Sequence, residues 1–178
     1  MASNRGPMVE EAINGMKEYF SSFSNFSNAR FYDHTMSVLA NSEKILEGEK
    51  VEGHFLASVV SLAGVYHDIG IPESLKKYNS SDAPYQEKEG PPIARELMKK
   101  IGVRPDILER VCYIVGAHHT KEKVDGIDFQ ILWEADFIVN VLEKNLHFSS
   151  EELPAAAKEN LRSSTARAIA SKLFSLSL

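Results

Sequence analysis

The stretch "LAGVYHDIGI", residues 62–71, joins an apolar helical pattern to two adjacent groups of metal-ligand type, His67 and Asp68. The pattern recurs at steps of four, three and four, which is the period of one face of an α-helix. The residues on this face are Leu56, Val60, Ala63 and His67. We expect the face to be buried, and a buried polar group needs a partner or a ligand. Gly70 permits a turn at the helix end, so that His67 and Asp68 converge on one point.

The same periodicity extends over almost the whole chain and predicts an all-α fold. No run alternates with a period of two for long enough to predict a strand. Helices are predicted at 8–21, 29–48, 52–67, 86–101, 105–119, 128–145 and 154–175. We expect a single compact bundle of about six to seven helices. The longest irregular stretch, 70–84, is expected to be either a lid over a site or a solvated connector with a short helical turn.

The length of 178 residues fits one domain with a hydrophobic core. We expect residues 1–7 to form a flexible N-terminal tail and residues 8–178 to form the domain. The stretch at about 154–175 is amphipathic. We expect it to dock on the domain as one helix, with a homodimer interface as the alternative.

Composition excludes several classes of protein. The net charge of −5 does not favour a nucleic-acid partner or an anionic membrane surface. No run reaches the roughly 18 to 20 apolar residues that span a bilayer, and the first residues resemble no secretory signal. The single cysteine, Cys112, excludes an internal disulfide and a cysteine-based zinc site. We therefore expect a cytoplasmic protein without a membrane or nucleic-acid polymer as partner.

Four predicted helices each bring histidine or aspartate to an apolar face. These residues are His34, His67, His118 with His119, and Asp136. An ionised carboxylate without a partner is costly to bury, and a buried network of ion pairs seldom repays its desolvation. A divalent cation would keep the carboxylates ionised and the imidazoles neutral, and it accepts nitrogen and oxygen ligands together. The pattern therefore indicates a metal site formed where these helices meet.

The order of these residues resembles that of the HD-domain superfamily of metal-dependent phosphohydrolases. The matching segments are "RFYDHTMSV" with His34, "VYHDIG" with His67 and Asp68, and "WEADFIV" with Asp136, within a motif core at 29–145. The resemblance implies that these four residues bind a divalent metal ion, with Mn, Fe, Co, Ni, Zn and Mg not distinguished. It also implies hydrolysis of a phosphoester or phosphoanhydride by a metal-activated water. The expected substrate is a small phosphorylated molecule, with a nucleotide as the first candidate.

The sequence is similar to the HDIG branch of that superfamily but is not a complete HD-GYP protein. Gln86 stands where HD-GYP proteins have an additional histidine, and no "GYP" follows the pair in "GAHHT". We therefore expect one metal ion and disfavour a second. Glu87 or Glu89 is the alternative ligand in place of the missing histidine.

The resemblance also suggests roles for residues around the metal. Asp68, His118 and His119 are the expected catalytic residues, and the two histidines would contact the phosphate or act as general acid. Substrate-binding candidates are Lys76, Lys77, Arg30 and Gln86; the alternative for the lysines is a solvated surface. Two other functions stay open: a ligand-sensing module without turnover, and a di-iron oxygenase, which would need more ligands for a second iron.

Overall fold

The chain folds into an all-helical structure, as the periodicity predicts. The computed structural model describes residues 5–23 and 28–178, and within them it contains no strand. The helices outnumber the six to seven predicted. They are α1 (Pro7–Ser21), α2 (Asn28–Gly48), α3 (His54–Tyr66), α4 (Ile71–Tyr78), α5 (Ala83–Lys100), α6 (Pro105–Val115), α7 (Ile127–Leu142), α8 (Leu153–Asn160) and α9 (Ser164–Phe174), with a 3₁₀ turn at Lys121–Lys123.

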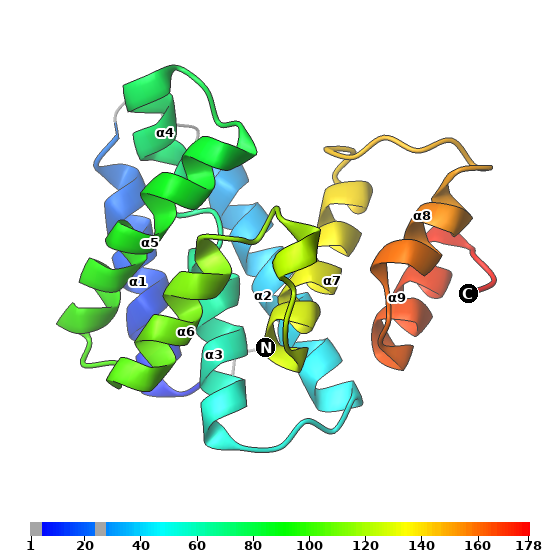
Figure 1. Cartoon of the computed structure of the whole chain (residues 1–178), viewed down its shortest axis with the longest axis horizontal. Coiled ribbons are helices and arrows are strands. Elements are labelled where there is room, and N and C mark those ends of the chain that lie inside the picture. The colour runs from blue at the N-terminus through cyan, green and yellow to red at the C-terminus, as the bar shows by residue number, and fades with distance from the viewer. Residues whose placement is uncertain (1–4, 24–27) are drawn as a thin grey trace.

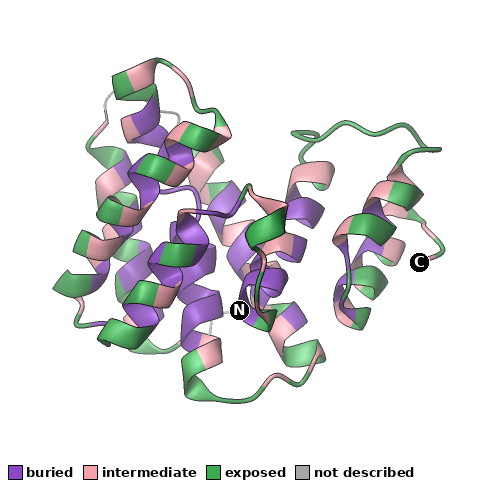
Figure 2. Ribbon diagram, in the orientation of Figure 1, coloured by how far each residue is buried: buried purple, intermediate pink, exposed green. Residues whose placement is uncertain are grey.

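Helix α3 is the centre of the core. It packs against α1, α2, α6 and α7 (Figure 1), and every residue from Ser58 to Tyr66 is buried (Figure 2). Within the described residues, the stretch His54–Tyr78 is long and apolar enough to cross a membrane, but 78% of its most apolar part lies inside the protein. This burial is what a core helix of a globular domain requires.

Residues 70–84 are not the irregular stretch that was predicted, because most of them form α4. Pro72 lies in the first turn of α4, where proline is well tolerated, and Asn79 ends the helix in a left-handed conformation with φ of 53°. Ile71 and Ser74 are buried against the rest of the domain. The helical turn expected in the connector alternative is therefore a full helix, and only a short connection remains before α5.

The turn after α3 is tight, and the role of Gly70 in it differs from the predicted one. The Ile69 N–H donates to the Tyr66 carbonyl and the Ile71 N–H to the Asp68 carbonyl, a spacing of three residues. Gly70 has a φ of −76°, so it needs no left-handed freedom. Its role is close approach, because a Cβ there would lie 2.6 Å from the Gln86 carbonyl oxygen and 2.8 Å from the Gly90 nitrogen.

The predicted helix 154–175 is two helices, α8 and α9, which lie beside α7 (Figure 1). The chain is extended at Leu161 and Ser163, and the Ser163 hydroxyl caps α9 by accepting from the Ala166 N–H at 3.1 Å. The fully buried Glu134 of α7 accepts from the Arg162 and Ser163 N–H groups. A serine N-cap and a buried carboxylate thus explain why the helix breaks here.

The predicted N-terminal tail is described only in part. Residues 1–4 lie outside the described residues. The guanidinium of Arg5 forms an ion pair with Glu43 at 2.7 Å, and Pro7 begins α1.

Replacing Gly70 with alanine is expected to lower the free energy of unfolding by about 1–3 kcal/mol, since the new methyl group would overlap backbone atoms of α5 that cannot rotate away. Urea unfolding followed by circular dichroism measures this. Gly15→Ala is the matched control. A Cβ at Gly15 would lie 3.9 Å from the nearest neighbouring atom, Leu97 Cδ2, so the free energy of unfolding is expected to be unchanged or to rise by about 0.5–1 kcal/mol. Equal effects of the two substitutions would contradict the close-approach role of Gly70.

Candidate metal centre

Residues from three helical segments meet at one buried point. His34 comes from α2, Asp136 from α7, and His67 and Asp68 directly follow α3. The His34 Nε2 atom lies 3.5 Å from Asp68 Oδ2, 3.3 Å from Asp136 Oδ1 and 3.4 Å from His67 Nε2. His67 Nε2 lies 3.4 Å from Asp68 Oδ2 and 3.7 Å from Asp136 Oδ1. The four residues predicted as metal ligands are therefore adjacent in space.

A fourth segment adds His118. Helix α6 ends at Val115, earlier than predicted, so both histidines of "GAHHT" lie in the turn that follows it. His118 Nε2 lies 3.4 Å from Asp68 Oδ1, and its ring centroid is 5.6 Å from that of His67. Asp68 therefore contacts three imidazoles, and each of its two oxygens faces at least one of them.

Each of the three buried histidines is oriented by its Nδ1 atom. His67 Nδ1 lies 2.9 Å from the Gly64 carbonyl and His118 Nδ1 2.8 Å from the Val115 carbonyl. His34 Nδ1 lies 2.9 Å from a carboxylate oxygen of Glu143. Carbonyl and carboxylate oxygens only accept hydrogen bonds, so Nδ1 carries the proton in all three rings. In the neutral ring Nε2 is then the free ligand atom, and all three Nε2 atoms face the carboxylates.

The charges in the cluster stabilise one another. Burial raises the pKa of Asp68, but the charge on His67 and the hydrogen bond from His118 outweigh it and hold that pKa well below its usual range. Burial also raises the pKa of Asp136, and the hydrogen bond from His34 brings it below the ordinary value. Both carboxylates are therefore ionised at neutral pH.

The imidazoles respond in the opposite direction. Burial lowers the pKa of His34, but the hydrogen bond to Asp136 and the charge of Asp68 raise it to about 9. Burial lowers the pKa of His118 as well, and the hydrogen bond to Asp68 brings it above the ordinary value. The cluster thus stabilises positive charge at its centre, whether a proton or a cation carries it.

The cluster opens into a cavity of about 470 Å³. The lining includes His34, Asp68 and Asp136 from the cluster, and Arg30, Gln86, His119, Asn140, Glu143 and Asn145 around it. Arg30 donates from Nη2 to Asn145 Oδ1 at 2.7 Å, and Gln86 Oε1 lies 3.3 Å from His119 Nε2. The predicted substrate-binding residues Arg30 and Gln86 are therefore in the wall of the cavity.

His119 lies at the rim of the cavity and differs from His118. The residue is exposed, yet its ring packs on His118 with 3.9 Å between centroids. Partial burial of the ring and the charge on His118 lower the pKa of His119 to about 4. His119 is therefore neutral at pH 7, which suits hydrogen bonding better than donation of a proton.

The structure does not bring the two predicted lysines to this cavity. Lys76 lies 3.7 Å from Glu73, and Lys77 forms an ion pair with Glu89 at 2.6 Å. Glu89 also accepts from the Tyr78 hydroxyl, and Glu87 accepts from the Thr120 hydroxyl and the His119 N–H. The two glutamates considered as replacement ligands therefore have partners of their own.

Three polar residues at the site were missed by the sequence analysis. Asn140 donates to Asp136 Oδ1 at 2.8 Å, Asn145 donates to Asn140 Oδ1 at 3.1 Å, and Glu143 holds His34. Asn140 and Glu143 follow Asp136 by four and seven residues, the spacing of one helix face. Periodicity was a usable signal for both, whereas Asn145 lies beyond the end of α7.

The donor set fits a divalent cation. Ligand atoms of His34, His67 and Asp68 all lie within 4.8 Å of one another, and Asp136 Oδ1 is close to both imidazoles. His118 Nε2 is buried and faces Asp68 Oδ1 at 3.4 Å. Asp68, His118 and His119 form a second group with the same spacing, which shares Asp68 with the first. Imidazole and carboxylate ligands suit Mn, Fe, Co, Ni and Zn.

Comparison with known families agrees with this geometry. A family model described as the HD domain matches residues 31–153, more than half of the chain. The chain belongs to the HD domain family. No curated protein matches it. The HD domain is also similar to the crystal structure of a "predicted HD superfamily hydrolase" from an uncultured Thermotogales bacterium, with a TM-score of 0.67 and 22% identity over 95% of this chain and 86% of that one. At this identity the similarity shows a shared fold.

Adding Mn²⁺ to metal-free protein is expected to raise its melting temperature, because an ion bound only by the folded state stabilises it. At 100 times Kd the gain is about 2.7 kcal/mol, which corresponds to roughly 5–10 °C for a domain of this size. Asp68→Asn is expected to abolish the rise, as measured by calorimetry with and without the ion.

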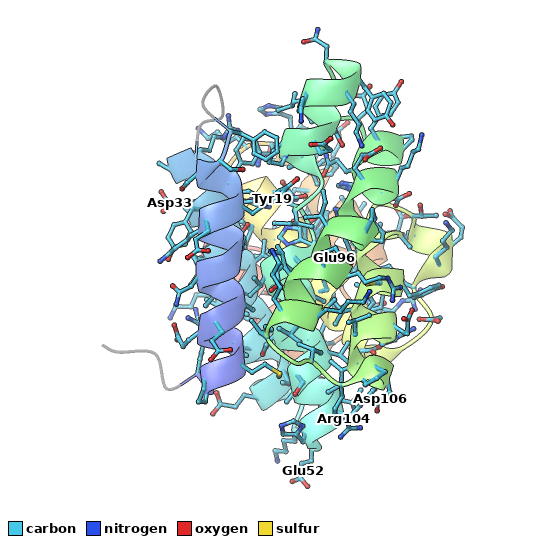
Figure 3. All side chains as sticks on the ribbon, turned by 90° about the vertical axis from the view of Figure 1, so that its left-hand side faces the viewer. Tyr19, Asp33, Glu52, Glu96, Arg104 and Asp106 are labelled. Atoms are coloured by element: carbon cyan, nitrogen blue, oxygen red, sulfur yellow. The ribbon has the colours of Figure 1, made fainter. Side chains whose placement is uncertain are left out.

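The matched control is Asp106→Asn. Asp106 lies with Arg104 on the surface near the start of α6, and both are labelled at the lower end of the molecule in Figure 3. This variant is expected to keep the full response to Mn²⁺. A rise in Asp68→Asn equal to that of the unsubstituted protein would contradict the assignment of the metal centre.

Proposed function

We propose that this HD domain is a metal-dependent phosphohydrolase that cleaves a phosphoester or phosphoanhydride of a small phosphorylated molecule, with a nucleotide as the first candidate. The observation that carries the proposal is the orientation of three imidazoles. The Nε2 atoms of His34, His67 and His118 all face the Asp68 carboxylate, which borders an open cavity. A purely structural ion network would not need such an arrangement beside a cavity of this size.

The metal is assigned to His34, His67, Asp68 and Asp136. A divalent ion bound there supplies polarisation of the phosphoryl group and a bound water of lowered pKa. One ion is proposed, since Gln86 occupies the position of the additional histidine and its amide bonds to the Ser81 carbonyl. The contribution of the protein is to fix the donors: Gly64, Val115 and Glu143 hold the rings so that no reorientation is needed during the reaction.

Other residues of the cavity are assigned to the substrate. Arg30 is the one arginine or lysine in the described lining of this cavity, and its guanidinium would pair with phosphate oxygens. His118 is proposed to donate a proton or a hydrogen bond to the leaving oxygen. His119 and Gln86, side by side at the rim, are proposed to donate hydrogen bonds to the phosphate. The roles considered for Lys76 and Lys77 remain a prediction.

The size of the cavity and the charge of the chain favour a small substrate. A volume of about 470 Å³ accommodates a small phosphorylated molecule, and a net charge of −5 gives no field that would attract a polyanion. A ligand-sensing domain would share the cavity, but it would have no need for three fixed Nε2 atoms around a carboxylate.

The test is release of inorganic phosphate from AMP and from ribose 5-phosphate by the full chain loaded separately with Mn²⁺, Fe²⁺, Co²⁺, Ni²⁺, Zn²⁺ or Mg²⁺. Turnover is expected with at least one ion. His118→Gln is expected to lower kcat about 10²–10⁴-fold, the usual contribution of a general acid. Asp106→Asn, the surface control, is expected to keep the rate.

Binding of phosphorylated compounds without phosphate release, in every metal, would contradict the hydrolase and favour the sensing module. Elemental analysis of the same samples gives the number of ions per chain. A value near one supports the single-metal assignment, and a value near two would reverse it in favour of the second group at Asp68, His118 and His119.

A further inference from the structure

A second cavity of about 340 Å³ adjoins the metal centre. It shares four lining residues with the first cavity: His119, Asp136, Asn140 and Asn145. A molecule whose phosphoryl group lies at the cluster can therefore extend across these residues into the second cavity. The added space is on the side of α7 and α8, beneath the connection 143–152, which arches between these helices in Figure 1.

The new walls of this cavity are mainly aromatic. Trp133 and Phe137 come from α7, and Leu146 and Phe148 come from the connection that follows it. The Phe137 and Phe148 rings lie 6.1 Å apart between centroids at an angle of 45°. Flat rings bind well against such side chains, because both offset stacking and edge contacts are favourable.

The polar groups around these rings are already paired within the protein. Trp133 Nε1 donates to Asn160 Oδ1 at 3.1 Å, and Asn160 Nδ2 donates to the Ala156 carbonyl at 2.8 Å. Asn140 and Asn145 are joined to each other and to Asp136. The described lining contains no lysine or arginine. Apart from His118 and His119, which belong to the metal centre, the described lining thus offers no free donor or cation for a second phosphate, and this part of the cavity favours an uncharged group.

Two of the apolar residues are unusually accessible. Leu146 is 41% exposed and Phe148 is 37% exposed. Both lie on the irregular connection 143–152, whose residues are all exposed. Large exposed apolar side chains at the edge of a cavity commonly mark a ligand site. A flat ring bound in this cavity against Phe148 would cover part of this exposed apolar surface.

We infer that this second cavity binds an uncharged aromatic ring of the substrate while the phosphoryl group lies at the metal centre, an inference that rests on the proposed hydrolase. Trp133 and Phe148 are then the residues that determine specificity. Recognition is by stacking and not by hydrogen bonds to the ring edge, so different rings are accepted with similar affinity.

The chain offers a direct probe, because Trp133 is its single tryptophan. Its fluorescence is recorded while the full chain is titrated with adenosine, AMP or ribose 5-phosphate. Adenosine and AMP, which carry the ring, are expected to change the emission in a saturable way. Ribose 5-phosphate, which lacks the aromatic ring, is expected to leave the emission unchanged. This readout needs neither a metal ion nor turnover.

Phe148→Ala is expected to raise Kd for adenosine about five- to tenfold, the loss of one ring contact. Phe148→Tyr, which keeps an aromatic ring at this position, is expected to bind adenosine with the Kd of the unsubstituted protein. Leu142→Ala removes an apolar residue that is 53% exposed but lines neither cavity, and it is expected to change nothing. An unchanged Kd in Phe148→Ala, no saturable response to adenosine, or an equal response to ribose 5-phosphate would each overturn the inference.

The phosphate-release assay separates this inference from the hydrolase itself. Release from AMP and ribose 5-phosphate with equal kcat/KM, without adenosine binding, would remove the ring site and leave the hydrolase. Saturable adenosine binding that depends on Phe148, without phosphate release in any metal, would keep the ring site and remove the hydrolase.

Discussion

The Asp68 carboxylate is the constraint on which the centre of this protein depends. A buried ionised carboxylate is unfavourable unless positive charge or hydrogen bonds surround it, and Asp68 is only 9% exposed. Three imidazoles solve this problem, each within 3.5 Å of one of its oxygens. Since those imidazoles come from α2 and from the ends of α3 and α6, the packing of these helices has to satisfy one small group of charged atoms.

Two of the three histidines are held by the same local device. The rings of His67 and His118 each donate to a carbonyl three residues earlier, at Gly64 and Val115. Carbonyls in the last turn of a helix lack partners within the helix, so a ring N–H satisfies one of them and is itself fixed in direction. The end of a helix thus supplies the orientation that a metal ligand needs, and the fold uses it at both α3 and α6.

The sequence predicted the part of the structure that depends on burial. His34 and Asp136 lie on apolar helical faces, and His67 and His118 directly follow the apolar faces of α3 and α6, so their convergence follows from packing those faces on one core. Features that depend on polar contacts between segments were not predictable in this way. The break before α9 depends on Glu134, and α4 is masked in the sequence by its lysines and by the polar residues that follow it. Periodicity placed Glu143 on the face of Asp136, but its contact with His34, 109 residues away, follows from no local pattern.

The contact at Gly70 also determines which sides of the centre can move. The backbone of the turn after Asp68 touches that of α5 at Gln86 and Gly90, so the wall that carries Gln86 is locked to the core. Another part of the wall belongs to the connection 143–152, whose residues are exposed and which has no helix of its own. Local opening is least costly where few buried contacts are lost. Opening the structure on the side of Phe148 therefore breaks fewer buried contacts than opening it on the side of Gln86.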